Sequence, residues 1–439
     1  MKKIIYSIFL SLLLVGCDFL ETPPALGLTE DKLVDLQAMR ALVNGSYDAS
    51  RAFLDDISAY DMLIVRDMAV RNKPEWDSFF EHQFDFDICF QQLYKAIGIL
   101  NELSVHNMQD MEGSQEEKDV ILGEMYFMRA LLYFIVNTHY ELPSTGWSAP
   151  LVLKPVEVGE RLSCAKASDI RIQIEKDIEQ ARSLLKGKNT ILADYYAATA
   201  LAARIYFYHE NYILAYQYAN EVITSSKYVL EDVSAPFVPL KESRENIFTM
   251  IYNSVDNLSP VDELFERLQA SDTQGALYLN VKGELKAFFD VNDKRYQTFF
   301  KEQDNVIYGS EKYSTDKMNY PYIRLAEMYL TRAEANIMNT GSVSQQDVDD
   351  LNKLIERSLP ANALTSIPSK DEMLEFLYKE RTREMALEVG DHFLNVKRLK
   401  RGIVSYQGDG YVPYSEYADK VVSIFPDTEM AFHDLNRNQ

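Results

Sequence analysis

Tryptophan, histidine and cysteine are all scarce in this sequence. The 439 residues include 2 Trp, 6 His and 3 Cys. So few histidines leave little room for metal sites or imidazole acid–base chemistry. Cys89 and Cys164 lie far apart without metal-ligand spacing. They could pair in an oxidising compartment, but we expect two buried free thiols. The shortage of Trp also limits the aromatic surfaces on which a sugar ring could stack.

Positive charge is in deficit as well. The chain has 45 Lys and Arg against 67 Asp and Glu, which gives a formal net charge of −22 at pH 7. Such a surface repels the phosphates of nucleic acids and anionic lipids, so we exclude nucleic acid as a partner. With so many acidic residues, carboxylate pairs arise by chance and do not indicate a glycosidase. The P-loop, Rossmann, nucleophile-elbow and zincin motifs are also missing. We therefore expect no enzyme, no catalytic residue, no metal site and no cofactor.

Beyond its first residues the sequence has no apolar run of about 20 residues, the length that crosses a bilayer. The start carries two lysines, an apolar stretch at 4–15 and then Leu-Val-Gly-Cys ending at Cys17. This order resembles a bacterial lipobox, so we expect a signal peptide at 1–16 and acyl chains on Cys17. The alternative is an ordinary signal peptide with a chance cysteine. Residues 17–30, with two adjacent prolines, would form an extended tether, and the lipid anchor would be the sole membrane contact.

What the sequence has in abundance is helical periodicity. Apolar residues follow helical spacing over residues 31–48, 79–103 and 116–140, and the last segment becomes apolar all round after Arg129. Residues 193–225 predict two helices in which alanines lie beside tyrosines. Small side chains packed against aromatic ones are typical of tetratricopeptide helix pairs.

Further helix pairs are predicted at 320–356 and 372–400. The whole pattern predicts a mainly α fold of about four degenerate tetratricopeptide-type units in one domain, residues 31–439. These helical repeats would occupy roughly residues 31–50, 116–230 and 320–402.

Two stretches interrupt the repeats, at roughly 51–80 and 236–315. There we expect an irregular, loop-rich lobe with short strands, since residues 246–252 alternate in a β-prone manner. Aromatic and polar side chains gather in both stretches. If the two stretches meet in space, they would combine aromatic faces with polar side chains that form bidentate hydrogen bonds to hydroxyl groups. The candidate ligand-binding residues are Arg71, Trp76, Tyr278 and Tyr296.

Residues 320–335, YPYIRLAEMYLTRAEA, form the segment around which the chain is organised. Pro321 would suit the first position of a helix, because its ring fixes φ and it has no N–H to leave unpaired. The predicted helix is apolar on more than one face, which leaves two interpretations for its charges. They form either a solvated stripe of i,i+3 pairs or a buried network of partnered groups. The residues concerned are Arg324, Glu327, Arg332 and Glu334.

This segment resembles the signature helix of SusD/RagB-type proteins, which are outer-membrane nutrient-binding lipoproteins. That helix has an aromatic residue and a proline at its start, an Arg-Leu-Ala-Glu core and an Ala-Glu-Ala end. The matching residues are Pro321, Arg324, Leu325, Ala326, Glu327, Tyr329, Leu330, Ala333, Glu334 and Ala335.

A second segment, residues 377–401, resembles the same family. The matching residues are Lys379, Glu380, Arg381, Glu384, Glu388, Gly390, Lys397 and Arg398. The segment departs from the family where an Arg–Asp pair is usual, because His392 and Asn395 stand there. We interpret this as a neutral structural exchange.

The resemblance implies a SusD-like fold and a lipid-anchored outer-membrane protein exposed at the cell surface. Such a protein captures an oligosaccharide and delivers it to a SusC-like TonB-dependent transporter. In the family the ligand lies on the side away from the repeats and faces that transporter. A peptide ligand, as in the RagB branch with its oligopeptide uptake complexes, stays open because Trp is so scarce.

Overall fold

The computed structural model describes residues 33, 35–51, 53–70, 87–252, 254, 259–268, 279–281, 283–303, 306–309, 311–404 and 410–437. The predicted signal peptide and tether lie outside these residues. So do four of the residues singled out above: Cys17, Arg71, Trp76 and Tyr278.

Helices account for most of the described residues, which confirms the mainly α class expected from the sequence. The helices of the first half are α2 (Leu36–Arg51), α3 (Leu54–Ile64), α4 (Asp87–Val105), α5 (Gln115–Tyr140), α6 (Ala167–Leu185), α7 (Tyr195–Tyr208) and α8 (Tyr212–Thr224). Those of the second half are α9 (Asp262–Leu268), α10 (Gly283–Lys286), α11 (Lys294–Phe299), α12 (Leu325–Thr340), α13 (Gln345–Ser358), α14 (Lys370–Glu384), α15 (Asp391–Arg398), α16 (Tyr414–Tyr417) and α17 (Asp427–Phe432). The strands are β1 (Met68–Val70), β2 (Asn246–Met250), β3 (Leu279–Val281), β4 (Lys301–Gln303), β5 (Val306–Tyr308), β6 (Tyr320–Arg324), β7 (Ile403–Val404) and β8 (Tyr411–Val412).

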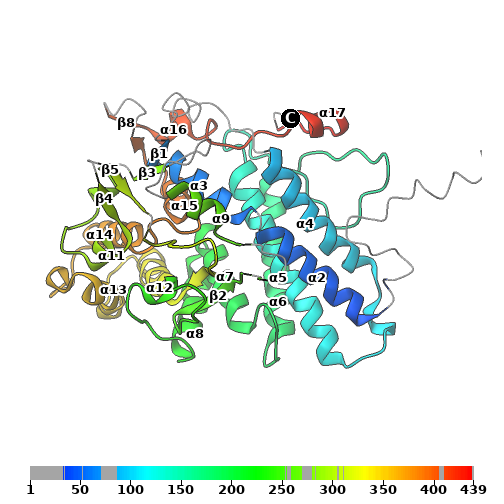
Figure 1. Cartoon of the computed structure of the whole chain (residues 1–439), viewed down its shortest axis with the longest axis horizontal. Helices are drawn as coiled ribbons and strands as arrows, with labels where there is room; N and C mark the ends of the chain where they lie inside the picture. The colour runs from blue at the N-terminus through cyan, green and yellow to red at the C-terminus, as the bar shows by residue number, and fades with distance from the viewer. Residues whose placement is uncertain are drawn as a thin grey trace, which may run out of the picture.

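Helices α2, α4, α5 and α6 pack together at one end of the molecule, on the right in Figure 1. The central helix is α5, whose first turn is capped by Ser114, since its hydroxyl accepts a hydrogen bond from Glu117 N at 3.1 Å. Beyond Arg129 this helix is buried nearly all round. Arg129 is itself buried and donates to both carboxylate oxygens of Asp177 in α6, at 2.7 and 2.9 Å. The buried charge therefore has its partner on the neighbouring helix.

The later helices pack in pairs across the centre and left of Figure 1: α7 with α8, α12 with α13, and α14 with α15. Helix α8 lies against α12 and so joins one pair to the next. In α8, Ala215 and Ala219 are completely buried, while Tyr216 and Tyr218 pack against the core from its edge. This is the small-against-aromatic packing expected of tetratricopeptide-type pairs.

Residues 320–324 are a strand, so the prediction of a helix starting at Pro321 is wrong. Strand β6 pairs with β2 in a two-stranded antiparallel sheet, where Pro321 lies opposite Thr249 and the register shifts on both sides of Phe248. A proline without an N–H is tolerated because β6 has a partner on one side only in the described structure. Arg324 is still extended, with φ −119° and ψ 156°, and α12 begins at Leu325.

The charges of the central segment form a buried network, which decides between the two interpretations. The exposed fractions are 2% for Arg324, 0% for Glu327, 3% for Arg332 and 4% for Glu334. Each has a partner on another element. Arg332 binds Asp350 at 2.6 and 2.7 Å, and Glu327 accepts from Arg204 at 2.6 and 2.7 Å.

The two irregular stretches meet in a four-stranded sheet with the order β1-β3-β5-β4. Strand β1 comes from the first stretch and β3 from the second; they are antiparallel, with Met68 opposite Val281 and Val70 opposite Leu279. The first stretch is less irregular than expected, because residues 54–64 form helix α3. The apolar periodicity of α3 is interrupted by Asp61, which is buried and lies 2.9 Å from His139 of α5.

Helices α14 and α15 are separated by a sharp turn. Leu387, Val389 and Gly390 all have positive φ, at 64°, 43° and 63°. Gly390 is required here for a second reason, since a Cβ at this position would lie 1.9 Å from Asp61 Oδ2. The turn thus brings the start of α15 against α3.

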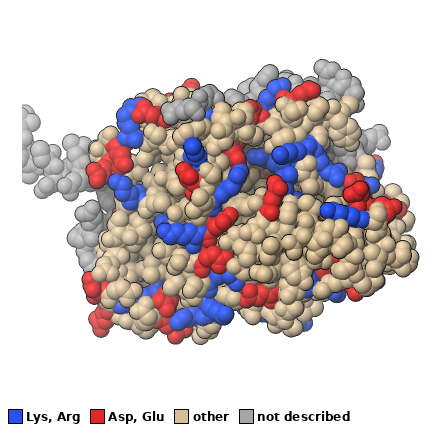
Figure 2. Space-filling view, turned by 180° about the vertical axis from the view of Figure 1, so that it is seen from behind, with Lys and Arg blue, Asp and Glu red and all other residues tan. Residues whose placement is uncertain are grey.

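Charge is distributed rather than concentrated on the face shown in Figure 2. Lys and Arg side chains are interspersed with Asp and Glu there. The net charge of −22 therefore does not make this face a surface of one sign.

Candidate functional site

A cleft of about 840 Å³ lies beside α15, next to the strands where the two irregular stretches meet. Val65 and Asp67 come directly before β1, and Ala287 and Phe288 directly follow α10, so both stretches contribute to its wall. Helices α14 and α15 and the β7–β8 pair contribute the rest. We call this the Tyr378 cleft; its polar and aromatic lining consists of Asp67, Phe288, Glu375, Tyr378, Lys379, Arg383, His392, Arg401 and Tyr411.

A chain of hydrogen bonds fixes one wall of the Tyr378 cleft. His392 Nδ1 lies 2.8 Å from Asp67 Oδ2, and His392 Nε2 lies 2.9 Å from the hydroxyl of Tyr378. Because the carboxylate can only accept, Nδ1 of His392 carries a proton, and this bond orients Nε2 toward the phenol oxygen. Burial raises the pKa of Tyr378 above its ordinary value, and the nearby guanidinium of Arg401 offsets only part of that rise. Tyr378 is therefore a neutral phenol suited to hydrogen bonding rather than to nucleophilic attack.

The guanidinium of Arg401 lies flat against this wall. Its central carbon is 3.6 Å from the centroid of the Tyr378 ring, a cation–π contact, and Nη2 binds Glu375 Oε2 at 2.6 Å. One face of the guanidinium is thus held by the ring and one edge by the carboxylate. Its remaining N–H groups are positioned at the cleft without further ordering cost.

Aromatic rings form the other surfaces of the cleft. The Phe288 ring meets those of Tyr378 and His392 edge-on, at centroid distances of 6.1 and 5.9 Å. Its backbone oxygen accepts from Arg383 at 3.1 Å. Tyr411, on β8, is 77% exposed and is the most accessible ring of the lining. Rings and fixed donors together can hold a polar molecule that has apolar faces.

The predicted ligand residues have different outcomes. Tyr296 is half-buried on α11, where its ring stacks on Phe300 at 5.5 Å and its hydroxyl lies 3.5 Å from Glu302. It does not line the Tyr378 cleft. Arg71 directly follows β1 and Tyr278 directly precedes β3 in the sequence; like Trp76, they lie outside the described residues. Their role stays a prediction.

Sequence analysis missed most residues that line the Tyr378 cleft. His392 stood out only as a departure from the family pattern. It and Asn395 occupy the places of the family's usual Arg–Asp pair, and we interpreted this replacement as neutral. The two do not pair: His392 binds Asp67, whereas Asn395 Nδ2 donates to Asp391 Oδ2 at 3.0 Å. Asp67 and His392 are 325 residues apart in the sequence, and no local pattern connects them.

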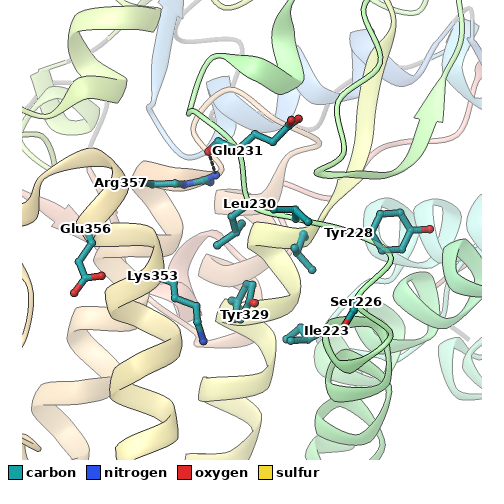
Figure 3. A pocket seen from close by; sticks show the side chains of 11 residues that line it. Ile223, Ser226, Tyr228, Leu230, Glu231, Tyr329, Lys353, Glu356 and Arg357 are labelled. Atoms are coloured by element: carbon teal, nitrogen blue, oxygen red, sulfur yellow. Dashed lines mark hydrogen bonds between the residues drawn. The ribbon is translucent and has the colours of Figure 1, made fainter.

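Another cavity, of about 670 Å³, lies among the helix pairs, between the end of α8, α12 and α13 (Figure 3). Arg357 points toward Glu231 and donates to its backbone oxygen at 3.0 Å. It also binds Glu245 at 2.6 Å. Lys353 lies over the ring of Tyr329, 4.9 Å from the centroid. No described residue of the two irregular stretches lines this cavity, whereas both stretches line the Tyr378 cleft, so the Tyr378 cleft is the better candidate.

Three further observations limit the chemistry of the described residues. Cys89 is buried and Cys164 half-buried, and burial raises the pKa of the Cys164 thiol to about 11. In the described part of the chain, no group of three or more His, Cys, Asp or Glu could hold a metal ion. Within the same residues, the helices are too short or too polar to cross a membrane.

Two family profiles match the chain. The profile described as "SusD family" matches residues 266–430, and the profile described as "Starch-binding associating with outer membrane" matches residues 19–207. No curated protein sequence matches.

Solved structures of low sequence identity have the same fold. The chain is similar to a SusD superfamily protein from Bacteroides thetaiotaomicron VPI-5482, with a TM-score of 0.77 and 19% identity over 92% of this chain and 100% of the other. It is also similar to one from Bacteroides vulgatus ATCC 8482, with a TM-score of 0.78 and 22% identity over 91% and 97%. A laminarin binding SusD-like protein has a TM-score of 0.70 and 17% identity over 92% and 99%. The two profiles together match most of the length of the chain, which thus resembles SusD-type proteins in sequence and has the SusD-like fold.

Proposed function

We propose that this protein captures an oligosaccharide at the cell surface and delivers it to a SusC-like TonB-dependent transporter. The observation that carries the proposal is the Tyr378 cleft at the meeting point of the two irregular stretches. Its exposed ring, Tyr411, can stack on the C–H face of a sugar, and the fixed guanidinium of Arg401 can bind hydroxyls. The family profile described as starch-binding, and the similar fold of a laminarin binding protein, support this class of ligand.

The lipobox at Cys17 supports the proposed location. Acyl chains on this residue would hold the protein on the outer membrane, with residues 17–30 as its tether. Arg71, Trp76, Tyr278 and Tyr296 are proposed to extend the binding surface from the Tyr378 cleft along the irregular lobe. The protein would bind its ligand without catalysing a reaction on it.

Affinity electrophoresis through gels that contain laminarin, starch or other glycans tests the ligand class, with a peptide library as the counterpart. We expect at least one glycan to retard the protein, and Trp76→Ala and Tyr411→Ala to weaken that retardation. Binding of peptides without any glycan would replace this proposal with a RagB-type function. Release of shorter sugars by the purified protein would contradict a pure binding role.

Purification of the lipidated protein from membranes in mild detergent tests the partner. A TonB-dependent β-barrel should accompany it in stoichiometric amount. Substitution of Cys17 by Ser should release the protein from the membrane fraction. Recovery of the lipidated protein alone would count against delivery to a transporter.

A further inference from the structure

A mostly apolar pocket of about 360 Å³ lies along α4 and shares no residue with the Tyr378 cleft. Four residues of α4 line it, and their spacing of four places them in one row on the helix: Phe90, Tyr94, Gly98 and Glu102. Residues between 150 and 156 form the second wall, and α17 with the residues after it forms the third. Helix α17 lies above α4 in the upper right of Figure 1. We call this site the Gly98 pocket.

Hydrogen bonds hold the walls of the Gly98 pocket in place. The hydroxyl of Tyr94 donates to Pro150 O at 2.6 Å, which joins the second wall to α4. Asp434 N donates to Leu162 O at 2.8 Å, which joins the C-terminal segment to the loop that follows the second wall. The pocket therefore exists before a ligand enters, so little affinity is lost to ordering the protein.

Gly98 lies in the interior of α4, where a glycine costs about 1 kcal/mol relative to alanine. The backbone does not require it, since Gly98 is not among the residues of positive φ. Close packing does not require it either, because a Cβ at this position would find no atom of a packed neighbour within 4 Å among the described residues. A larger side chain would enter the pocket instead. The glycine thus keeps the pocket open at a cost to the helix, which points to an occupant.

Glu102 supplies a carboxylate that is available to a ligand. It is half-buried, and within the part of the chain that the structure describes it forms no hydrogen bond or ion pair. Its oxygens are accessible, since they are not among the unpaired atoms that are closed off from solvent. The lysine of the lining, Lys154, has a side chain that is 65% exposed and lies 3.9 Å from Glu160. The negative charge of Glu102 is therefore not compensated by the protein.

Glu429 adds a second carboxylate to the lining, beside His433. Nδ1 of His433 accepts a hydrogen bond from Leu162 N at 3.2 Å, so this nitrogen carries no proton and the imidazole is neutral. Its Nε2 lies 3.7 Å from Glu429 Oε2, beyond hydrogen-bond distance. Arg161, on the same loop as Leu162, is bound to Asp434. The charged groups of the pocket thus favour a cation over an anion.

These groups define what the ligand must offer. Its body must be apolar, because the larger part of the wall is, including Phe90, Ile97, Val152, Val156, Leu162 and Leu435. The rings of Phe90 and Tyr94, with centroids 4.6 Å apart, provide aromatic surface for that body. Its polar end must be a cationic donor, since an ammonium forms charge-assisted hydrogen bonds with a carboxylate such as Glu102. The volume of the pocket is in the range of small-molecule sites.

We propose that the Gly98 pocket binds an organic cation, a protonated amine on an aromatic or aliphatic body. The body lies between α4 and residues 150–156, over Gly98, and the ammonium donates to Glu102. Glu429 adds to the attraction from the third wall. The site is separate from the Tyr378 cleft, and the inference does not depend on the function proposed for that cleft.

Isothermal titration of the purified protein at pH 7 with three molecules of one body tests this proposal. They are 4-phenylbutylamine, 4-phenylbutanol and 4-phenylbutyrate, which are cationic, neutral and anionic. We expect the amine to bind, the alcohol to bind at least about fivefold more weakly, and the acid more weakly still. Glu102→Gln should lower the affinity for the amine by the same factor and leave that for the alcohol unchanged. Glu356→Gln is the matched control, because it removes an exposed carboxylate at the cavity of Figure 3, and it should bind the amine as the wild type does.

A second variant tests the position of the body. Gly98→Leu fills the pocket from α4, so it should abolish binding of both the amine and the alcohol. Its melting temperature should equal or exceed that of the wild type, because leucine favours the helix and its Cβ meets open space. Thermal melting also checks that Glu102→Gln is folded. No binding of the amine to the wild type, binding of the acid as tight as that of the amine, or unchanged affinity in either folded variant would overturn the proposal. Loss of amine binding in Glu356→Gln would also overturn it, because the cation would then lie elsewhere.

Discussion

Arg324 Nε donates a hydrogen bond of 2.8 Å to Glu388 Oε2, and the two side chains are 2% and 0% exposed. This pair is the centre of a buried network in which cations and carboxylates alternate. Arg324 also binds Glu245 at 2.6 Å and Glu384 at 3.1 Å. The network joins the strand β6, the helix α14 and the turn before α15. The network contains equal numbers of cations and carboxylates. The cations are Arg295, Lys312, Arg324, Arg357 and Arg383, and the carboxylates are Glu245, Asp293, Glu380, Glu384 and Glu388.

Arg324→Met should strongly destabilise the protein. The substitution leaves three buried carboxylates without their shared cation, and removal of one partner from a buried ion pair costs about 3–5 kcal/mol. Urea unfolding followed by circular dichroism measures the loss. Arg161→Met is the control, since Arg161 and Asp434 form an exposed pair and should contribute nothing measurable. Equal stability of the two variants would contradict the importance of the network.

Lys312→Met should abolish a rise in the free energy of unfolding that the wild type shows between pH 8 and pH 10.5. Lys312 lies within the network and donates to Ala386 O at 2.6 Å. Burial, the largest influence, lowers the pKa of Lys312 from 10.5 to about 8. Below pH 8 both folded and unfolded chains hold this proton. Between pH 8 and 10.5 only the unfolded chain holds it, so the free energy of unfolding of the wild type rises with pH.

The size of this effect follows from the displacement of the pKa. The wild type should gain about 3 kcal/mol relative to Lys312→Met between pH 8 and pH 10.5. Urea unfolding of both proteins across this range measures the difference, in which the titration of other groups cancels. A difference that does not change with pH would show that Lys312 has an ordinary pKa in the folded protein.

Gly390→Ala should cost far more stability than Gly341→Ala. Both glycines have positive φ, +63° and +74°, so each substitution carries the left-handed penalty of about 1–2 kcal/mol. At Gly341 nothing lies within 4 Å of the new Cβ. At Gly390 the Cβ would meet Asp61 Oδ2 at 1.9 Å and push the carboxylate away from His139. Thermal melting should therefore rank the variants clearly, and similar melting temperatures would contradict the close approach of α15 to α3.

The helix pairs were predictable because their signal is local. In α8, the alternation of alanine and tyrosine specifies both the helix and its packing. Strand β6 was not predictable in this way, since Pro321 suits a helix start as well as a strand with one partner. Helix α3 was missed because its central Asp61 is polar in sequence but buried through His139, a partner 78 residues away.

The candidate site was harder to predict than the fold. Its aromatic residues Phe288 and Tyr378 lie in segments recognised as aromatic or helical, but nothing local indicates that they share a cleft. The connection depends on His392, which contacts Tyr378 on one nitrogen and Asp67 on the other. The two irregular stretches do meet in space, since β1 of the first pairs with β3 of the second, but that they bind a ligand stays a prediction.

Tyr411→Ala should weaken glycan binding without affecting stability. The ring is 77% exposed, so its removal costs little core packing. An aromatic ring stacked on a sugar contributes about 1 kcal/mol, which predicts a roughly fivefold loss of affinity. Affinity electrophoresis on the best-bound glycan measures the loss, and thermal melting verifies the fold. Phe432→Ala, at a ring of similar exposure (71%) on α17, is the matched control and should bind as the wild type does. If both variants or neither lose affinity, the Tyr378 cleft is not where the sugar ring stacks.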